Sequence, residues 1–236
     1  TFALPLGMWP NQRDLSARWI RQACDESLRR LKTDYIDLYQ MHHIDRSTPT
    51  DEILEAFLML RQQGKVIYFG SSNFGGWHIA RFNEQAYAAG LLGLVSEQSI
   101  YHPLNRKIEM EVVPACEEYG MGIIPWSPLA SGVLAGPPEG DGRRSDQSQL
   151  DTRQRHLAQL EKWEALCARL GEKPADVCIA WHLSRPFVTA PIIGPRTAEQ
   201  LHGAVHTLDI ELDDATLAEI DAIFPGHKTS PEEYAW

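Results

Sequence analysis

The chain alternates short apolar runs with longer amphipathic segments, and this alternation predicts its secondary structure. Each short run is apolar over most of its length, as expected for a strand that is buried on both faces. The predicted strands cover residues 35–43, 66–73, 93–101, 121–129 and 188–194, with residues 2–6 as a sixth candidate.

Between these runs, apolar residues recur at helical spacing. The predicted helices cover residues 16–31, 48–64, 77–89, 109–119, 153–170, 174–183, 197–205 and 213–223. Thr48 before Pro49 predicts an N-cap followed by proline at the first helical position. The stretch 136–151 is rich in Gly, Pro and Arg and predicts a long surface loop.

Strands that alternate with helices across short links are typical of βαβ units and a parallel sheet. An open doubly wound sheet that binds a dinucleotide usually carries a GxGxxG turn, and the chain has none. Polar residues at the carboxyl ends of the strands favour a (β/α)8 TIM barrel, whose site lies on that face. Eight strands are needed, so we expect two or three β/α units to precede Thr1 and residues 1–236 to form a single, N-terminally incomplete domain.

Composition and charge exclude several classes of partner and function. The 236 residues include 32 acidic and 22 basic side chains, giving a net charge of -10, which argues against nucleic acid or an anionic membrane as a partner. No apolar run is long enough for a membrane span. The four cysteines are far apart and form no CxxC pair, which predicts reduced thiols in a cytoplasmic protein and no metal site.

Four strand-end residues in the first half of the chain are candidates for a site: His42, Ser72, Asn73 and Gln98. Each also has a structural interpretation. A histidine here is more often simply hydrogen-bonded, and Ser and Asn are favoured in turns and caps. Glu97 and Gln98 form a polar pair inside an apolar strand and need hydrogen-bond partners, either a ligand or the neighbouring backbone.

Two further candidates lie in the second half. Trp126 and Ser127 end a predicted strand, where the indole either packs in the core or stacks against a flat heterocycle. Gly194 and Arg196 precede a predicted helix, and a helix N-terminus beside an arginine suits a phosphate. The structural alternative there is ordinary capping by Thr197.

The combination of these segments resembles the aldo-keto reductase superfamily. The resemblance rests on residues 27–42, 64–74, 96–98 and 126–129 and covers essentially the whole chain. Residues 42–46, 194–201 and the C-terminal tail are similar to those of actinobacterial members, some of them assigned as NDP-hexose 2,3-enoyl or 3-keto reductases of deoxysugar biosynthesis.

The resemblance implies a barrel that binds NADPH and reduces a carbonyl substrate by hydride transfer. His42 matches the catalytic histidine that orients the carbonyl. The remaining matches are cofactor-binding positions: Ser72, Asn73 and Gln98 for the nicotinamide carboxamide, Trp126 for the nicotinamide ring, Ser127 and Leu129 for the pyrophosphate, and Gly194, Arg196 and Gln200 for the adenosine phosphate.

The family also uses an Asp, a Tyr and a Lys, which we expect in segments before Thr1. Gly203 and Ala204 stand where an adenine-contacting Asn is often found. An alternative function is a non-catalytic or weakly catalytic NADP-binding regulatory subunit, as in relatives that serve membrane channels. The substrate, whether a simple aldehyde or ketone or an NDP-keto-deoxysugar, and the oligomeric state stay open.

Overall fold

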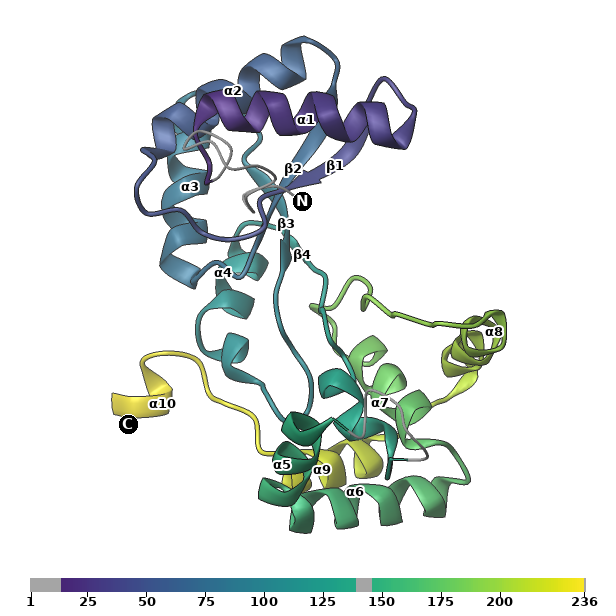
Figure 1. The fold of residues 1–236 in the computed structure, drawn as a ribbon. Helices are drawn as coiled ribbons and strands as arrows, with labels where there is room; N and C mark the ends of the chain where they lie inside the picture. The colour runs from purple at the N-terminus through teal and green to yellow at the C-terminus, as the bar shows by residue number, and fades with distance from the viewer. Residues whose placement is uncertain (1–13, 139–145, 236) are drawn as a thin grey trace. The chain divides into compact units, whose positions relative to one another are not determined.

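The computed structural model describes residues 14–138 and 146–235 (Figure 1). The chain forms two compact units. The first comprises Thr1–Ser99 and Glu111–Ile123, and the second comprises Ile100–Met110 and Ile124–Trp236. The predicted strand at residues 2–6 lies outside the described residues.

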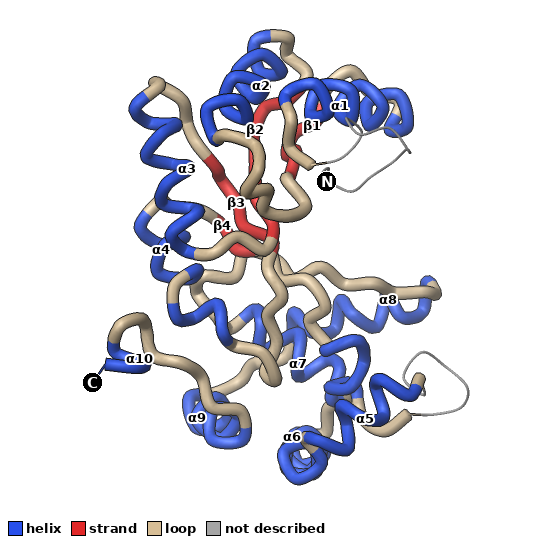
Figure 2. The backbone as a smooth tube through the Cα atoms, turned by 60° about the vertical axis from the view of Figure 1, so that its left-hand side comes forward, coloured by secondary structure: helices blue, strands red, loops and turns tan. Residues whose placement is uncertain are grey.

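The first unit is an α/β layer with a parallel sheet in the order β1-β2-β3-β4 (Figure 2). Its strands are β1 (Ile36–Gln40), β2 (Val66–Ser72), β3 (Leu94–Gln98) and β4 (Gly122–Ile123). Its helices are α1 (Ala17–Leu31), α2 (Thr50–Gln62), α3 (Gly76–Ala88) and α4 (Val112–Glu118). Helices α2, α3 and α4 separate consecutive strands along the chain, so the predicted parallel βαβ pattern is confirmed.

Aromatic packing joins the helices of this unit to the sheet. Phe57 of α2 stacks on Phe69 of β2 with ring centroids 3.8 Å apart, and Phe82 of α3 contacts Phe57 from the side. Gly70 is required where β2 passes β3, because a Cβ there would lie 2.3 Å from the Ser96 hydroxyl oxygen. These contacts fix the strand ends that carry the candidate residues.

The second unit is helical. It contains η1 (Lys107–Met110), η2 (Ala130–Ala135), α5 (Gln147–Arg155), α6 (Leu157–Leu170), α7 (Pro174–Leu183), α8 (Ala198–Val205), η4 (His206–Asp209), α9 (Asp214–Ile223) and α10 (Glu232–Ala235). Its core is aromatic: Trp163 donates its indole N–H to the Leu134 carbonyl at 3.1 Å, and buried Tyr101 stacks on Trp181.

Several predicted elements differ from the structure. Residues 188–194 form no strand: Val188 is a single bridge residue, and the Ile192 amide donates one hydrogen bond to the Pro125 carbonyl. The predicted helix 153–170 is broken at His156, whose φ of -112° interrupts it, into α5 and α6. Because α5 begins at Gln147, the connecting segment is shorter than the predicted loop 136–151.

The start of α2 also differs. Pro49, and not Thr48, is the N-cap residue, because the Thr48 hydroxyl donates to Asp45 instead of capping the helix. The predicted helix 109–119 is divided into η1 and α4. By contrast, α7 begins and ends where the sequence predicts, and α1, whose N-cap is Ser16, ends at Leu31 as predicted.

Candidate functional site

Ser72, Asn73 and Gln98 come together at the carboxyl ends of β2 and β3. Ser72 and Gln98 are register partners, and the Ser72 hydroxyl donates to the Gln98 carbonyl at 2.8 Å. The Asn73 amide N–H donates to the same carbonyl at 3.1 Å, and its side-chain amide donates to the Ser72 oxygen at 2.9 Å. Asn73 has a φ of 56°, a left-handed conformation in which Asn is favoured.

The buried carboxylate of Glu97 holds these two strand ends in register. It accepts hydrogen bonds from the Ser71 hydroxyl at 2.5 Å, the Ser99 hydroxyl at 2.7 Å and the Phe74 amide at 3.1 Å. Burial raises the pKa of Glu97, and these hydrogen bonds oppose the rise. The partners that the sequence analysis required for Glu97 are therefore two hydroxyls and one backbone amide.

His42 follows β1 and is half-buried, whereas neighbouring His43 is exposed. The two rings stack with centroids 4.5 Å apart. The ladder extends one residue beyond β1, since the Met41 amide donates to the Gly70 carbonyl at 2.9 Å. Burial and the nearby His43 lower the pKa of His42, so its imidazole is neutral at neutral pH and can act as a hydrogen-bond donor.

Asp45 fixes the loop that leaves His42. Its carboxylate accepts from the amide and hydroxyl groups of Ser47 and Thr48 and from the Leu15 amide, 30 residues earlier. Partial burial alone would raise the pKa of Asp45, but these hydrogen bonds outweigh it and lower the pKa to about 2. The loop is thereby tied to the segment that opens α1.

Trp126, Ser127 and Leu129 lie in a turn of the second unit. Trp126 is half-buried and pairs with Ile100 in a parallel bridge. Ser127 has a φ of 55°, and its hydroxyl oxygen accepts from the Ser131 amide at 3.1 Å. The Pro128 carbonyl, between the two candidate residues, accepts from the Cys178 thiol. The turn is thus held by its own side chains and by α7.

Gly194, Arg196 and Gln200 gather at the start of α8, also in the second unit, and all three are exposed. The Thr197 hydroxyl caps the helix by accepting from the Gln200 amide, and the Gln200 side chain accepts from the Arg196 amide at 2.7 Å. Thr197 therefore caps the helix, as the structural alternative predicts, and Gln200 takes part in the same hydrogen bonding. Among the described residues, no carboxylate pairs with the Arg196 guanidinium.

The predicted site residues thus form two sets. His42, Ser72, Asn73 and Gln98 belong to the first unit, and Trp126, Ser127, Leu129, Gly194, Arg196 and Gln200 belong to the second. Hydrogen bonds join Ser72, Asn73 and Gln98 to one another and Arg196 to Gln200.

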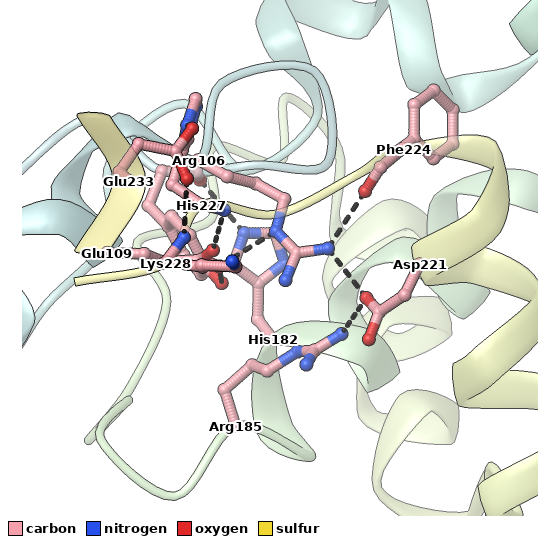
Figure 3. Close-up of polar contacts among 10 residues, drawn as sticks. Arg106, Glu109, His182, Arg185, Asp221, Phe224, His227, Lys228 and Glu233 are labelled. Atoms are coloured by element: carbon pink, nitrogen blue, oxygen red, sulfur yellow. Dashed lines mark hydrogen bonds and ion pairs between the residues drawn. The ribbon is translucent and has the colours of Figure 1, made fainter. Parts of the chain in front are cut away.

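A charge network around the buried Arg106 of the second unit was missed by the sequence analysis (Figure 3). Arg106 donates to the Glu109 carboxylate at 2.7 Å, to the Asp221 carboxylate at 2.6 Å and to the Phe224 carbonyl at 2.8 Å. Arg185 reaches the same Asp221 oxygen at 2.9 Å. The partners on α9 and its end are 115 and 118 residues from Arg106, so no local pattern could have revealed them.

This network also fastens the C-terminal segment. Glu109 accepts from the His227 amide at 3.0 Å, and the Met110 carbonyl accepts from the Ser230 amide at 2.8 Å. Within the segment, the His227 ring and the Glu233 carboxylate are joined by a 2.8 Å hydrogen bond. The C-terminal segment is therefore attached to η1 rather than to a candidate site residue.

The described residues contain neither a metal-binding cluster nor a membrane-spanning helix. Residues 14–138 and 146–235 hold no group of three or more His, Cys, Asp or Glu side chains arranged to bind a metal ion. No helix in these ranges combines the length and the apolar character needed to cross a membrane.

A parallel βαβ sheet with hydroxyl and amide groups at adjoining strand ends defines an α/β protein with a candidate ligand site at the carboxyl edge of the sheet. The chain matches the model of the Aldo/keto reductase family over residues 7–224, and it belongs to that family.

Three relatives illustrate the range of the family. The chain is 48% identical over 230 residues to the uncharacterized oxidoreductase YrpG of Bacillus subtilis, covering 96% of this chain and 71% of that protein. It is 32% identical to versiconal hemiacetal acetate reductase of Aspergillus parasiticus, covering 94% and 68%. It is 31% identical to a putative voltage-gated potassium channel subunit beta of Schizosaccharomyces pombe, covering 91% and 66%. The first two names support an oxidoreductase.

Proposed function

We propose that the protein is an NADPH-dependent oxidoreductase that reduces the carbonyl group of a small aldehyde or ketone to an alcohol. The observation that carries the proposal is the hydrogen-bonded set Ser72, Asn73 and Gln98 at the ends of β2 and β3. Family membership and the two relatives named as an oxidoreductase and a reductase support it. The family also supports a (β/α)8 barrel as the fold, with residues 1–236 belonging to one domain.

Each unit, taken by itself, contains described residues that suit one part of a nicotinamide cofactor. In the first unit, the half-buried Gln98 side-chain amide has no hydrogen-bond partner among the described residues, and it can both donate to and accept from a carboxamide. In the second unit, the half-buried Trp126 indole would stack on the nicotinamide ring, and the Ser127–Leu129 turn would face the pyrophosphate. The cofactor, when bound, supplies the hydride.

In this proposal, the Arg196 guanidinium group binds the 2′-phosphate of the cofactor. Its side chain is exposed and carries no ion pair among the described residues, while its backbone amide is held by Gln200. Gly194 leaves the approach open, because nothing lies within 4 Å of the position that a Cβ would occupy there. A guanidinium at the start of a helix suits a phosphate dianion.

His42 would position the substrate carbonyl. Its neutral imidazole can donate a hydrogen bond to the carbonyl oxygen, and this bond strengthens as negative charge develops on that oxygen. The Asp45-anchored loop limits the movement of the segment that follows the ring. His42 would therefore lower the barrier without itself gaining or losing a proton.

The test is an assay of turnover. Purified protein is mixed with NADPH and a panel of aldehydes, ketones and NDP-keto-deoxysugars, and the loss of NADPH absorbance is measured. Oxidation that depends on one carbonyl class supports the proposal and identifies that class. The relatives named as potassium channel beta subunits favour a second candidate, a regulatory NADP-binding subunit. Tight NADPH binding without turnover on any panel member would favour that candidate instead.

We also propose a cytoplasmic location. All four cysteines, Cys24, Cys116, Cys167 and Cys178, are free and buried. Free thiols are typical of reducing compartments. Secretion of the natural protein into the medium would contradict this assignment.

A further inference from the structure

The start of α3 lacks the features that normally satisfy a helix N-terminus. Its N-cap residue is Gly75, which has no side chain to cap with. The Gly75 carbonyl accepts from the amides of His78 and Ile79, but among the described residues no acceptor meets the amides of Gly76 and Trp77. A helix of thirteen residues therefore presents free N–H groups at its positive end.

His78 lies against this helix start and is buried without a polar partner. The residue is only 9% exposed, and neither ring nitrogen has a hydrogen-bond partner among the described residues. The Nδ1 atom faces the N-cap, since a Cβ on Gly75 would lie 3.1 Å from it. Trp77 and Phe74 pack on the ring but provide nothing for its nitrogens. Buried polar atoms normally have a partner, so a missing ligand is indicated.

Two arginines, Arg46 and Arg81, carry positive charge that acts on His78, and Arg81 follows it by three residues on α3. Burial lowers the pKa of His78 most, and the two guanidinium groups lower it further. Among the described residues neither arginine forms an ion pair, although the chain has a net charge of -10. The acidic residue packed here is Glu111, which meets Gly76 through its backbone carbonyl and Cβ while its side chain is exposed.

We propose that the start of α3 is a binding site for a phosphate-class oxyanion. The Gly76 and Trp77 amides and the His78 ring would donate hydrogen bonds to it, and Arg46 and Arg81 would neutralise its charge. Gly75 follows Asn73 by two residues, so the site lies at the same end of β2 as the candidate carboxamide-binding residues (Figure 2). A phosphorylated small molecule, such as a nucleoside-diphosphate sugar, and free inorganic phosphate share this chemistry. The proposal concerns binding and does not require turnover.

The test is calorimetric titration of the protein with inorganic phosphate and, separately, with a nucleoside-diphosphate sugar, at matched ionic strength. We expect saturable binding that weakens at least tenfold in His78→Phe, which keeps the ring packing, and in Arg81→Gln. Arg21→Gln removes an exposed arginine of α1 and is the matched control, with unchanged affinity. In nitrogen NMR, the His78 resonances should shift on binding.

The outcomes separate the ligand sources. Tighter binding of the nucleotide sugar than of phosphate identifies a phosphorylated organic ligand, and equal binding identifies free phosphate. If His78→Phe fails to fold, exposed Arg46 provides the second variant, Arg46→Gln. The proposal is overturned by absence of saturable binding, by an equal loss in Arg21→Gln, or by unchanged affinity in the three site variants. It is also overturned if these variants weaken NADPH as much as Arg196→Ala does, because the residues would then belong to the cofactor site.

Discussion

The Ser71 hydroxyl donates a 2.5 Å hydrogen bond to the buried Glu97 carboxylate, linking β2 and β3 one residue before Ser72 and Gln98. The same carboxylate accepts from Ser99 and from the Phe74 amide, so it connects the residues that flank the candidate site on both strands. Glu97 touches no proposed ligand atom. Its role is to position the strand ends.

We expect Glu97→Ala to lower the free energy of unfolding by about 2–4 kcal/mol, because it leaves two hydroxyls and one amide buried without an acceptor. Glu55→Ala removes an exposed glutamate of α2 and should change stability by less than about 0.5 kcal/mol. Urea unfolding followed by circular dichroism measures both. Equal effects in the two variants would show that the Glu97 contacts contribute little.

The raised pKa of Glu97 predicts a pH dependence of stability. The folded protein binds this proton more tightly than the unfolded chain, whose glutamate titrates near 4.5. The contribution of Glu97 is therefore complete below pH 4.5 and is lost as the pH rises through the folded-state pKa. The stability of the native protein relative to Glu97→Gln should fall over this interval. A relative stability that increases with pH would mean that hydrogen bonding, and not burial, dominates at this carboxyl group.

The local part of the fold could be predicted from the sequence. Apolar residues at helical spacing located α1 and α7, because this spacing is a local pattern that the packed structure preserves. Residues 188–194 were wrongly predicted as a strand, since apolar content alone does not supply a pairing neighbour. The break at His156 was not predicted either, because helical periodicity continues across it.

The same distinction between local patterns and long-range contacts applies to the residues of the candidate site. Residues that follow a strand, such as Ser72 and Asn73, could be selected because the strand itself is a local pattern. The partners of Arg106 and Glu97 could not, since they come from elements far apart in the sequence. Buried charge is revealed only once the helices are packed.

His42→Ala should lower kcat by roughly a hundredfold or more and leave NADPH affinity nearly unchanged, because the imidazole is proposed to act on the substrate oxygen. The chain offers a matched control in His43→Ala, which removes the exposed neighbouring ring and should keep most activity. Steady-state kinetics and NADPH fluorescence titration measure the two quantities. Parallel losses of kcat and cofactor affinity in His42→Ala would count against the assignment.

Arg196→Ala should weaken NADPH binding by about tenfold or more while changing NADH binding little, since only NADPH carries the 2′-phosphate. The Arg196 backbone contact to Gln200 does not involve the guanidinium, so the cap of α8 should remain. Arg21→Ala, which removes an exposed arginine of α1 outside the proposed cofactor site, serves as the control. An unchanged ratio of the two affinities in Arg196→Ala would mean that another group holds the phosphate.

Arg106→Leu should lower the free energy of unfolding by roughly 3–5 kcal/mol, because it leaves the nearly buried Glu109 without its cation and removes a donor to Asp221. The chain supplies a comparison in Arg169, whose 2.6 Å ion pair with Glu219 also reaches α9 but is 62% exposed on the arginine side. Solvent screens such a pair, so Arg169→Ala should change stability little. Thermal unfolding of both variants provides the measurement, with proteolysis of the C-terminal segment as a second readout.

Arg106→Leu should speed cleavage near residues 225–231, because Glu109 and Met110 hold this segment through η1. Cleavage at the native rate, together with a stability loss no larger than that of Arg169→Ala, would show that the segment is held without the Arg106 network.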